Sequence, residues 1–328
     1  MRTVIARAPL RLPLAGGLTD LPAFLAHARG TTVSLALDAY VYAVLKPNRN
    51  GQTTLHLNQS TFFAESSASL PNALVRSVMS TVKCDLTGVD IYLFSDLPGS
   101  SGMGGSGAAT AALTTALVAF LGLDIQQREA IRLATQAEAV ITRNGGYHDA
   151  AIALLGGLQK IDYDITGVVD SEIVGTEELW TNLCSNMTAA WTGVSGPSAP
   201  PVLDISVNIE KHYNSLSRMA EISSLLGSLL PKSGLSRTVI ALINENQTLK
   251  AKVVGEGYAA KHADLMRALG AAGEDVAAIL PGAKLGSSIW MIGSSTMALD
   301  YAEAALSQLC TTPMLVPRPA AAARALIF

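Results

Sequence analysis

The stretch DLPGSSGMGGSG at residues 96–107 contains five glycines and three serines, and a run of small and apolar residues follows it directly. Glycine costs backbone entropy, so a glycine-rich loop before a good helix indicates that something needs the space. A helix N-terminus leaves its first N–H groups without partners and carries roughly half a positive charge. The loop therefore predicts a local site for an anion, either a phosphate or a carboxylate.

A structural alternative reads the same residues as an ordinary strand-to-helix turn in which Ser106 caps the helix. The loop is not a Walker A loop, because no Gly-Lys-Ser or Gly-Lys-Thr follows it, and its glycines lack the GxGxxG spacing. From the loop alone, both the anion site and the capped turn stay open.

Composition narrows the class of protein. The chain has 328 residues, of which 49% are hydrophobic and 15% charged, enough for a packed core in two domains or one large one. The formal net charge of -3 provides no broad basic surface for nucleic acid or for an anionic membrane. Any phosphate site must therefore be local.

The cysteines and the N-terminus point to a cytoplasmic protein. Cys84, Cys184 and Cys310 are far apart, and no Cys/His metal-ligand spacing occurs, so we expect reduced thiols. The first residues lack the pattern of a signal peptide, and the most apolar run, residues 108–123, is too short to span a bilayer.

Residue patterns predict an alternation of strands and helices. We expect two strands joined by a turn in residues 2–16, and a loop over residues 196–204, where three prolines forbid a regular ladder. No element is predicted for the alanine-rich tail at 320–325. The other predicted strands are 31–47, 52–57, 88–95, 158–165, 187–194, 284–293 and 313–318. The predicted helices are 71–82, 105–121, 125–143, 147–155, 205–230, 233–247, 258–270 and 296–309.

The glycine-rich loop also resembles a family motif. PGSSGMGGSGA, residues 98–108, is similar to the second motif of the GHMP kinases, roughly P-x-x-S-G-L-G-S-S-A. Met103 replaces Leu in a volume-conserving exchange, and Gly105 replaces the first Ser of the pair. Ser106 keeps the second.

Four further stretches support the resemblance. RAPLRLPLAGGLTD, residues 7–20, is similar to the first motif as found in the branch of heptose 7-phosphate kinases and L-fucokinases. The strand after it resembles that branch's strand into a D-x-Y pair, here Asp38 and Tyr40. GGYHD, residues 145–149, resembles the family's GG-x-Q-D segment, and WTGVS, residues 191–195, resembles its YTG-x-S/T-R stretch.

The resemblance implies an α+β fold of two domains, with the site in the cleft between them. The N-terminal domain, residues 1–175, would be ribosomal protein S5-like, and the C-terminal domain, residues 176–328, would be ferredoxin-like. The implied activity is ATP- and Mg²⁺-dependent phosphorylation of a hydroxyl, expected to be the anomeric one, on a heptose, a heptose 7-phosphate or a related sugar. The partner would be this small molecule, with neither nucleic acid nor membrane, and the protein would be a monomer or a homodimer.

Asp149 and Arg11 match the catalytic positions of the family. Asp149 would contact the acceptor hydroxyl as the base; the alternative is that it caps the helix that follows. Arg11 would polarise the acceptor or stabilise Asp149; the alternative is a solvated arginine at a strand end. Because an arginine lowers the pKa of a neighbouring carboxylate, the pair is expected to act mainly through orientation and electrostatics.

Ser106 and Glu138 match the Mg²⁺ ligands. Mg²⁺ takes hard oxygen ligands and few protein groups. Glu138 lies among apolar and small residues, where a carboxylate needs a reason, although it could simply face solvent. The nucleotide phosphates would contact the loop residues Pro98, Gly99, Ser100, Ser101, Gly102, Met103, Gly104, Gly105 and Ser106.

Asp20, with Thr19 and the Gly16-Gly17 turn, would hydrogen-bond sugar hydroxyls; the alternative is a simple turn aspartate before Pro22. His148 replaces the family's Gln and could contact substrate, although a lone histidine is more often structural. Tyr40 and Tyr147 would be walls of the pocket. The expected acceptor site comprises Arg11, Gly17, Thr19, Asp20, Tyr40, Gly146, His148 and Asp149.

Two departures from the family leave alternatives open. The third motif, glycine-rich in the family, matches only at the start of residues 282–288, and bulky Ile289 and Trp290 follow. Gly196 stands where the family has an arginine that would suit a 7-phosphate, so an unphosphorylated or altered sugar is also expected. A non-catalytic sugar- or nucleotide-binding protein on the kinase scaffold stays open. A kinase for a non-sugar alcohol does too, although the AGG-x-TD motif speaks against it.

Overall fold

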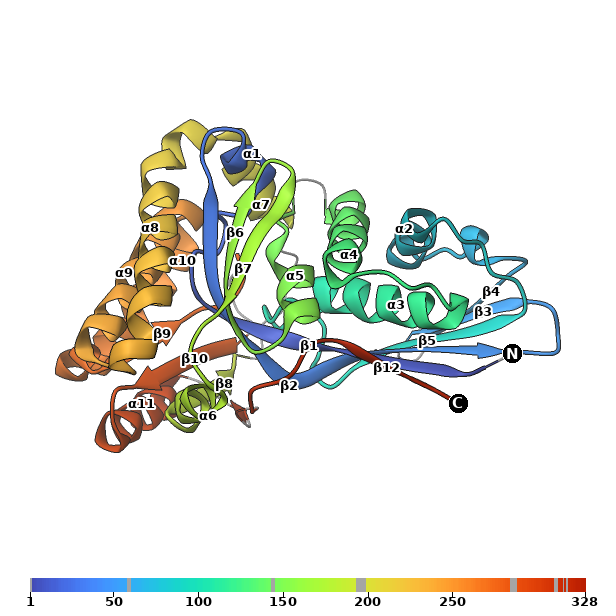
Figure 1. The fold of residues 1–328 in the computed structure, drawn as a ribbon. Coiled ribbons are helices and arrows are strands. Elements are labelled where there is room, and N and C mark those ends of the chain that lie inside the picture. The colour runs from blue at the N-terminus through green and yellow to red at the C-terminus, as the bar shows by residue number, and fades with distance from the viewer. Residues whose placement is uncertain are drawn as a thin grey trace.

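The structure is a computed structural model that describes residues 2–57, 60–142, 145–192, 199–283, 288–309, 312–314, 316 and 318–328. Two sheets organise these residues, an eight-stranded sheet and a four-stranded one (Figure 1). The mixed α/β content expected from the sequence is confirmed, with helices against both sheets.

The two longest strands, β1 (Val4–Ala15) and β2 (Gly30–Pro47), form the centre of the eight-stranded sheet. The prediction of two strands and a turn within residues 2–16 is wrong, because β1 runs unbroken through Pro9 and Pro13. The antiparallel register with β2 shifts directly after Pro9 and again after Pro13, and such irregularities accommodate residues that cannot donate to a ladder.

Strand β2 is long enough to bind two different partners along its other edge. Its first half pairs with β6 (Leu158–Asp164) and its second half with β5 (Val89–Ser95), both antiparallel. The outer strands are β3 (Thr53–Leu57), β4 (Ser60–Ala64) and β7 (Gly167–Ile173). Neither β4 nor β7 was predicted, and both have mostly exposed or half-buried residues without an apolar alternation.

Four helices follow the loops of this sheet: α2 (Ala73–Val82), α3 (Gly105–Leu121), α4 (Gln127–Thr142) and α5 (His148–Leu155). They lie on one face of the sheet, with α3 along β1 and β2 (Figure 1). Helix α3 is apolar nearly all round and mostly buried, as expected for a helix inside a core. It ends at Gly122 in the left-handed conformation, the stop predicted from the sequence.

The second sheet is antiparallel, in the order β11 (Thr312–Met314), β8 (Met187–Trp191), β10 (Ser288–Gly293), β9 (Val276–Ile279). Helices α6 (Glu177–Ser185) and α11 (Thr296–Leu309) lie near this sheet. Helices α8 (Ile209–Ser233), α9 (Arg237–Val254) and α10 (Glu256–Leu269) stand side by side at one end of the molecule, on the left in Figure 1. Short pieces complete the chain: α1 (Pro22–Leu25) and two 3-10 turns, Ser67–Ser69 and Gly270–Glu274.

The loop predicted over residues 196–204 is wrong in its second half, where α7 (Ala199–Val207) forms. Pro200 and Pro201 stand in the first turn of this helix, where a backbone N–H has no intrahelical partner to lose. The single helix predicted over 205–230 is in fact the end of α7 followed by α8, which begins at Ile209.

The C-terminal tail returns to the first sheet. Strand β12 (Arg324–Ile327) pairs antiparallel with the start of β1, so both ends of the chain lie on the same side (Figure 1). On its way the tail crosses Gly156, where a Cβ would lie 2.1 Å from the backbone nitrogen of Ala322. The tail therefore links the four-stranded sheet back to the eight-stranded one.

The structure bears on two predictions, one about membrane-spanning segments and one about the cysteines. Within the described ranges, none of the helices combines the length and the apolar character needed to cross a membrane. Cys84 and Cys184 are free thiols, as predicted, and Cys310 lies outside the described residues.

Candidate active site

A cavity of about 960 Å³ opens where β1, the glycine-rich loop, α4, α5 and α9 meet. This volume is typical of a small-molecule site. Among the residues that line it are Arg11, Gly17, Asp20, Glu138, Gly146, His148, Asp149 and Lys250, together with most of the loop.

The centre of the site is an ion pair between β1 and α5. Arg11 donates from Nε to Oδ1 of Asp149 at 2.8 Å, and its second nitrogen lies 2.7 Å from the same oxygen. Its third nitrogen donates to the carbonyl of Gly102 at 2.6 Å. Arg11 is 6% exposed, so the solvated strand-end alternative is wrong.

Asp149 lies in the first turn of α5, not at its cap. The cap position is Tyr147, without a side-chain cap bond, so the capping alternative is wrong. Burial by itself would raise the pKa of Asp149, but the nearby Arg11 guanidinium and His148 outweigh it and hold that pKa well below its usual range. The Asp149 side chain keeps 28% of its surface exposed toward the cavity that it lines.

Two glycines of the loop let α3 approach this pair. Gly104 has a φ of +74°, and a Cβ there would lie 3.1 Å from Cγ of Arg11. A Cβ on Gly107 would lie 2.4 Å from Cβ of Asp149, closer than any side chain tolerates. The glycines predicted to make room for an anion therefore also make room for the ion pair of Arg11 and Asp149.

The loop itself borders the cavity at every predicted position except Met103. Helix α3 begins at Gly105 with Gly104 at its cap and no side-chain cap bond, so the alternative of a turn capped by Ser106 is wrong. Met103 is fully buried, and its carbonyl accepts from the backbone N–H of Arg11 at 3.1 Å. The first N–H groups of α3 thus remain available to an anion in the cavity.

Glu138 fits a cation site. It is 5% exposed, which excludes the solvent-facing alternative, and its Oε2 is buried without a hydrogen-bond partner among the described residues. Burial raises the pKa of Glu138 well above its usual value, and the nearby Asp149 charge adds to this. Ser106 interacts with Glu138, so a hydroxyl and an uncompensated carboxylate lie together beside the loop, a donor set that suits Mg²⁺. The described residues contain no group of three or more histidines, cysteines and acids that could hold a metal.

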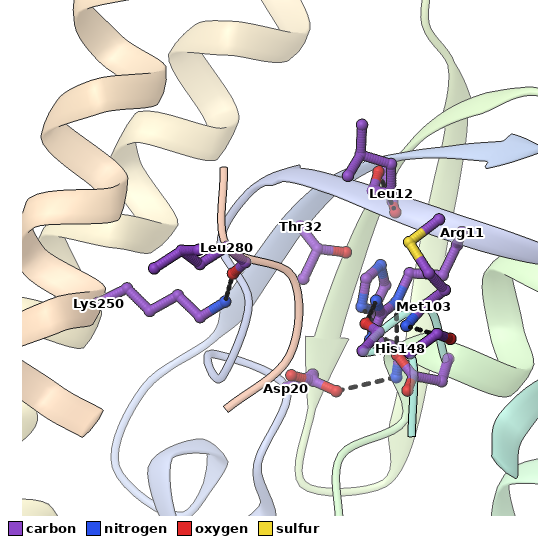
Figure 2. A network of polar contacts seen from close by, with 12 residues as sticks. Arg11, Leu12, Asp20, Thr32, Met103, His148, Lys250 and Leu280 are labelled. Carbon is purple, nitrogen blue, oxygen red and sulfur yellow. Dashed lines mark hydrogen bonds and ion pairs between the residues drawn. The ribbon is translucent and has the colours of Figure 1, made fainter. Parts of the chain in front are cut away.

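The acceptor residues predicted from the first motif and from the GGYHD segment at residues 145–149 also meet (Figure 2). Oδ2 of Asp20 accepts from the backbone N–H of His148 at 2.9 Å, and a Cβ on Gly146 would collide with that carboxylate. Burial raises the pKa of Asp20. His148 is 4% exposed, with Nδ1 3.4 Å from Asp149 and a buried Nε2 without a partner among the described residues. Asp20 is therefore more than a turn residue.

Besides Met103, three residues predicted for the acceptor side do not border the cavity as described. Thr19 is fully buried, and its hydroxyl donates to the carbonyls of Gly16 and Thr31, so it shapes the turn that carries Asp20. The Tyr40 ring lies under the guanidinium of Arg7 at 4.1 Å. Tyr147 is half-buried with its hydroxyl against the carbonyl of Ile165. The prediction of these two tyrosines as pocket walls is wrong, because strand alternation points Tyr40 toward Arg7.

The departures from the family fall partly outside the described residues, which exclude 193–198 and 284–287. The ends of the third-motif region do reach the loop: Gly282 lies against Gly102, and the hydroxyl of Ser288 donates to the carbonyl of Ser101 at 3.1 Å. Ile289 and Trp290 are buried in the core, so their bulk does not face the cavity.

Two groups of lining residues were not predicted. One is apolar and includes Leu57, Leu74 and Phe94. The other is Lys250 on α9, whose apolar stripe of Val239, Ile240 and Ile243 continues into buried polar residues. That break in the stripe is a signal the sequence contains, because i, i+3 and i+4 positions share a helix face.

Comparison with known proteins confirms the family resemblance. Residues 69–157 match the family of the GHMP kinases N terminal domain. A D-glycero-alpha-D-manno-heptose 7-phosphate kinase of Campylobacter jejuni is 25% identical over 174 residues, 50% of this chain and 51% of that protein. An L-fucokinase/L-fucose-1-P guanylyltransferase of Bacteroides fragilis is 24% identical over 66% of this chain and 27% of that protein. The chain thus spans about half the length, or less, of these curated relatives.

Solved structures show the same fold over the whole chain. A D-glycero-D-manno-heptose 1-phosphate kinase from Bacteroides thetaiotaomicron superposes with a TM-score of 0.75 at 17% identity, covering 98% of both chains. The L. major mevalonate kinase in complex with R-mevalonate has a TM-score of 0.66 at 18% identity, covering 96% of both chains. At such identities the likeness establishes the fold, which is that of the GHMP kinases.

Proposed function

We propose that this protein is a sugar kinase, which transfers the γ-phosphoryl group of ATP, with Mg²⁺, to a hydroxyl of a heptose, a heptose 7-phosphate or a related sugar. One observation carries the proposal. Arg11 of the first motif binds Asp149 and Gly102, 138 and 91 residues away along the chain, so three motifs join in one cavity. The heptose-type relatives support the sugar class, and we expect the anomeric hydroxyl as acceptor.

The nucleotide would occupy the side of the cavity formed by the glycine-rich loop. Its phosphates would accept from the first N–H groups of α3, where the helix dipole favours an anion. Its base would lie against the apolar end lined by Leu57, Leu74 and Phe94. Ser106 and Glu138 would hold Mg²⁺, which when bound neutralises charge on the phosphate oxygens.

Asp149 would accept the proton of the acceptor hydroxyl. The three contacts from Arg11 and His148 all reach Oδ1, and Oδ2 has no hydrogen bond among the described residues. As the hydroxyl oxygen forms its bond to the γ-phosphorus, the bond from phosphorus to the ADP oxygen breaks and ADP leaves with that electron pair. Because Arg11 makes Asp149 a weak base, its main contribution is to orient the hydroxyl, which suits a phosphoryl transfer that needs little covalent help.

The acceptor would lie on the side of Asp20, Gly17, Gly146 and His148. Asp20 would accept from sugar hydroxyls, and Nε2 of His148, which has no partner among the described residues, would bind another hydroxyl. Thr19 would contribute by shaping the turn. In this arrangement residues 1–175 supply most of the site, and residues 176–328 close it from the α9 side.

The test is ADP release with Mg-ATP across a panel of heptose, heptose 7-phosphate, fucose and related sugars. We expect release that requires a sugar and that disappears in Asp149→Ala, with Asp170→Asn, an exposed carboxylate on β7, as the matched control. Sugar-independent release, or none with any sugar while ATP still binds, would contradict the proposal and favour a binding protein on the kinase scaffold.

A further inference from the structure

The α9 wall of the cavity holds a buried cation that lies in none of the motifs. Lys250 is 3% exposed and borders the same cavity as Arg11 and Asp149. Figure 2 shows its side chain extending from the helix toward the side of the site that holds Asp20.

The ammonium group has only neutral partners. Nζ donates to the carbonyl of Leu280 at 2.7 Å and lies 5.3 Å from the centre of the Tyr258 ring. No carboxylate within the described residues lies at ion-pair distance from Lys250. The Leu280 carbonyl also accepts from the hydroxyl of Tyr258 at 2.6 Å, so it does not depend on the lysine. A buried cation without a counter-charge is costly, and beside a cavity it indicates a function rather than a structural role.

The position of Lys250 assigns it to the acceptor side. Asn246, one helical turn earlier on the same face, accepts from the backbone N–H of Gly16 at 3.0 Å. That contact ties α9 to the turn that leads into Thr19 and Asp20. The nucleotide side is built by the loop after β5 and by α3, to which no hydrogen bond from Lys250 runs within the described ranges.

We propose that Lys250 binds an anionic group of the acceptor, so that the protein acts on a sugar carrying a phosphate or a carboxylate in preference to the neutral sugar. The inference rests on the proposed kinase function and narrows it. The ammonium has three donors, of which Leu280 takes one, and anionic oxygens would accept from the others. The family has an arginine where this chain has Gly196. In this protein Lys250, on α9, would supply the positive charge instead.

The pKa of Lys250 supports the proposal that this lysine binds an anion, and it gives that binding a pH dependence. Burial, and then the Arg11 charge, lower the pKa of Lys250 to about 7, while Asp149 acts in the opposite sense. The charged and titratable groups around Lys250 are Arg11 of β1, Asp149 of α5, and Tyr258 and His262 of α10. Above pH 7 the free lysine loses its proton, so binding an anion must take one up. The apparent affinity for the anionic acceptor should therefore fall as the pH rises from 7 to 9, by at most tenfold per pH unit.

The first experiment compares kcat and KM for heptose, heptose 7-phosphate and a sugar acid in three proteins: wild type, Lys250→Met, and the control Lys252→Met. Lys252 lies on the same helix and is exposed. We expect the wild type to prefer one anionic sugar, and we expect Lys250→Met to raise KM for that sugar at least thirtyfold more than it raises KM for the neutral sugar or for ATP. The wild-type pH dependence between 7 and 9 should vanish in Lys250→Met, an outcome that a structural role would not produce. Which anionic sugar responds distinguishes a phosphate from a carboxylate.

A wild type that prefers the neutral sugar would overturn the inference. So would a Lys250→Met variant that loses kcat equally on all acceptors or raises KM for ATP as strongly as KM for that sugar, because the lysine would then contact the transferred phosphoryl group. If no sugar turns over, the proposed function fails, and calorimetry with heptose 7-phosphate and with inorganic phosphate still tests Lys250. Binding that is lost in Lys250→Met and kept in Lys252→Met would support the anion site, and equal binding in all three would reject it.

Discussion

The two walls of the cavity each hold a buried cation, and they hold it differently. Arg11, on the β1 wall, has all three guanidinium nitrogens engaged by Asp149 and Gly102. Lys250, on the α9 wall, has one carbonyl and an aromatic ring. The charge of the paired cation is balanced by Asp149, and its side chain is held by three contacts within the site. The unpaired cation has charge to offer to whatever enters the cavity.

The difference also appears in the pKa values. On the β1 wall, the ion pair keeps Asp149 ionised despite its burial, so the charges there balance. On the α9 wall, burial lowers the pKa of Lys250 to about 7, so its charge depends on pH in the physiological range. The Arg11–Asp149 pair is therefore expected to be insensitive to pH near neutrality, whereas the charge of Lys250 is expected to respond to it.

The largest effect on activity should come from removing the ion pair of the β1 wall, which we call the paired wall because Arg11 and Asp149 form a pair there. Asp149→Asn keeps the shape of the side chain and removes the charge that Arg11 holds, so we expect sugar-dependent ADP release to fall by about 10²–10⁴-fold. Steady-state assays at saturating ATP measure this. A variant within tenfold of the wild type would mean that Asp149 does not take part in the transfer.

The unpaired wall is the α9 side of the cavity, where Lys250 has no counter-charge among the described residues. The burial of Lys250 should lower the free energy of unfolding in a pH-dependent way. The pKa of Lys250 is lower in the folded protein, about 7, than in the unfolded chain, near 10.5, so the unfolded state binds more protons between these values and stability rises with pH across that window. Lys250→Met should therefore be more stable than the wild type at pH 7, by on the order of a few kcal/mol, with a gain that shrinks toward pH 10. Denaturant unfolding at several pH values measures it, and a constant difference would show that the lysine is not desolvated.

Metal removal tests the part of the paired wall beside the glycine-rich loop, where Glu138 and Ser106 lie. A chelator should abolish ADP release and Mg²⁺ should restore it. In Glu138→Gln the Mg²⁺ concentration needed for half-maximal activity should rise about 10–100-fold, because the variant loses a buried carboxylate oxygen that has no partner within the described part of the chain. Glu129→Gln is the control, because Glu129 is half-buried on the same helix, pairs with Arg132 and does not line the cavity. Equal Mg²⁺ dependence in both variants would remove Glu138 from the metal site.

The smallest effect should come from a side chain added where α3 lies close to the ion pair, and it should appear in the free energy of unfolding. A Cβ on Gly107 would collide with Asp149, whereas one on Gly105 would meet no atom within 4 Å. Gly107→Ala should lower the free energy of unfolding by about 1–3 kcal/mol, and Gly105→Ala should leave it unchanged or slightly raised. Thermal melts of both variants test the pair. Equal melting temperatures would indicate that the loop can move away from α5 at little cost.

The paired wall could be predicted from sequence because its residues lie in short, contiguous motifs. Arg11, Asp20, Gly146 and Asp149 each belong to a stretch whose local pattern is unusual, since glycine pairs and a buried charge have no place in an ordinary strand or helix. The structure brings all four to one cavity. Tyr40 and Tyr147 were misplaced because an aromatic residue near a motif is equally compatible with a neighbouring surface.

The unpaired wall could not be predicted in the same way. Lys250 is a single residue in an ordinary helix, and its meaning depends on the burial of one face of α9 and on the contact between Asn246 and Gly16. The apolar stripe of α9 does show that position 250 falls on the buried face. What the cation faces there is fixed by packing between segments far apart in the chain.

The sequence by itself determined the family fold, most helices and strands, the glycine-rich loop before α3 and the Arg11 and Asp149 candidates, because these rest on local periodicity and on short motifs. Only the tertiary structure decided that β1 runs unbroken, that the C-terminal tail returns as β12 beside it, and that α9 contributes a cation to the cavity. Strand pairing and burial depend on partners distant in the chain, and local pattern contains no information about which partner a backbone edge or a buried charge will meet.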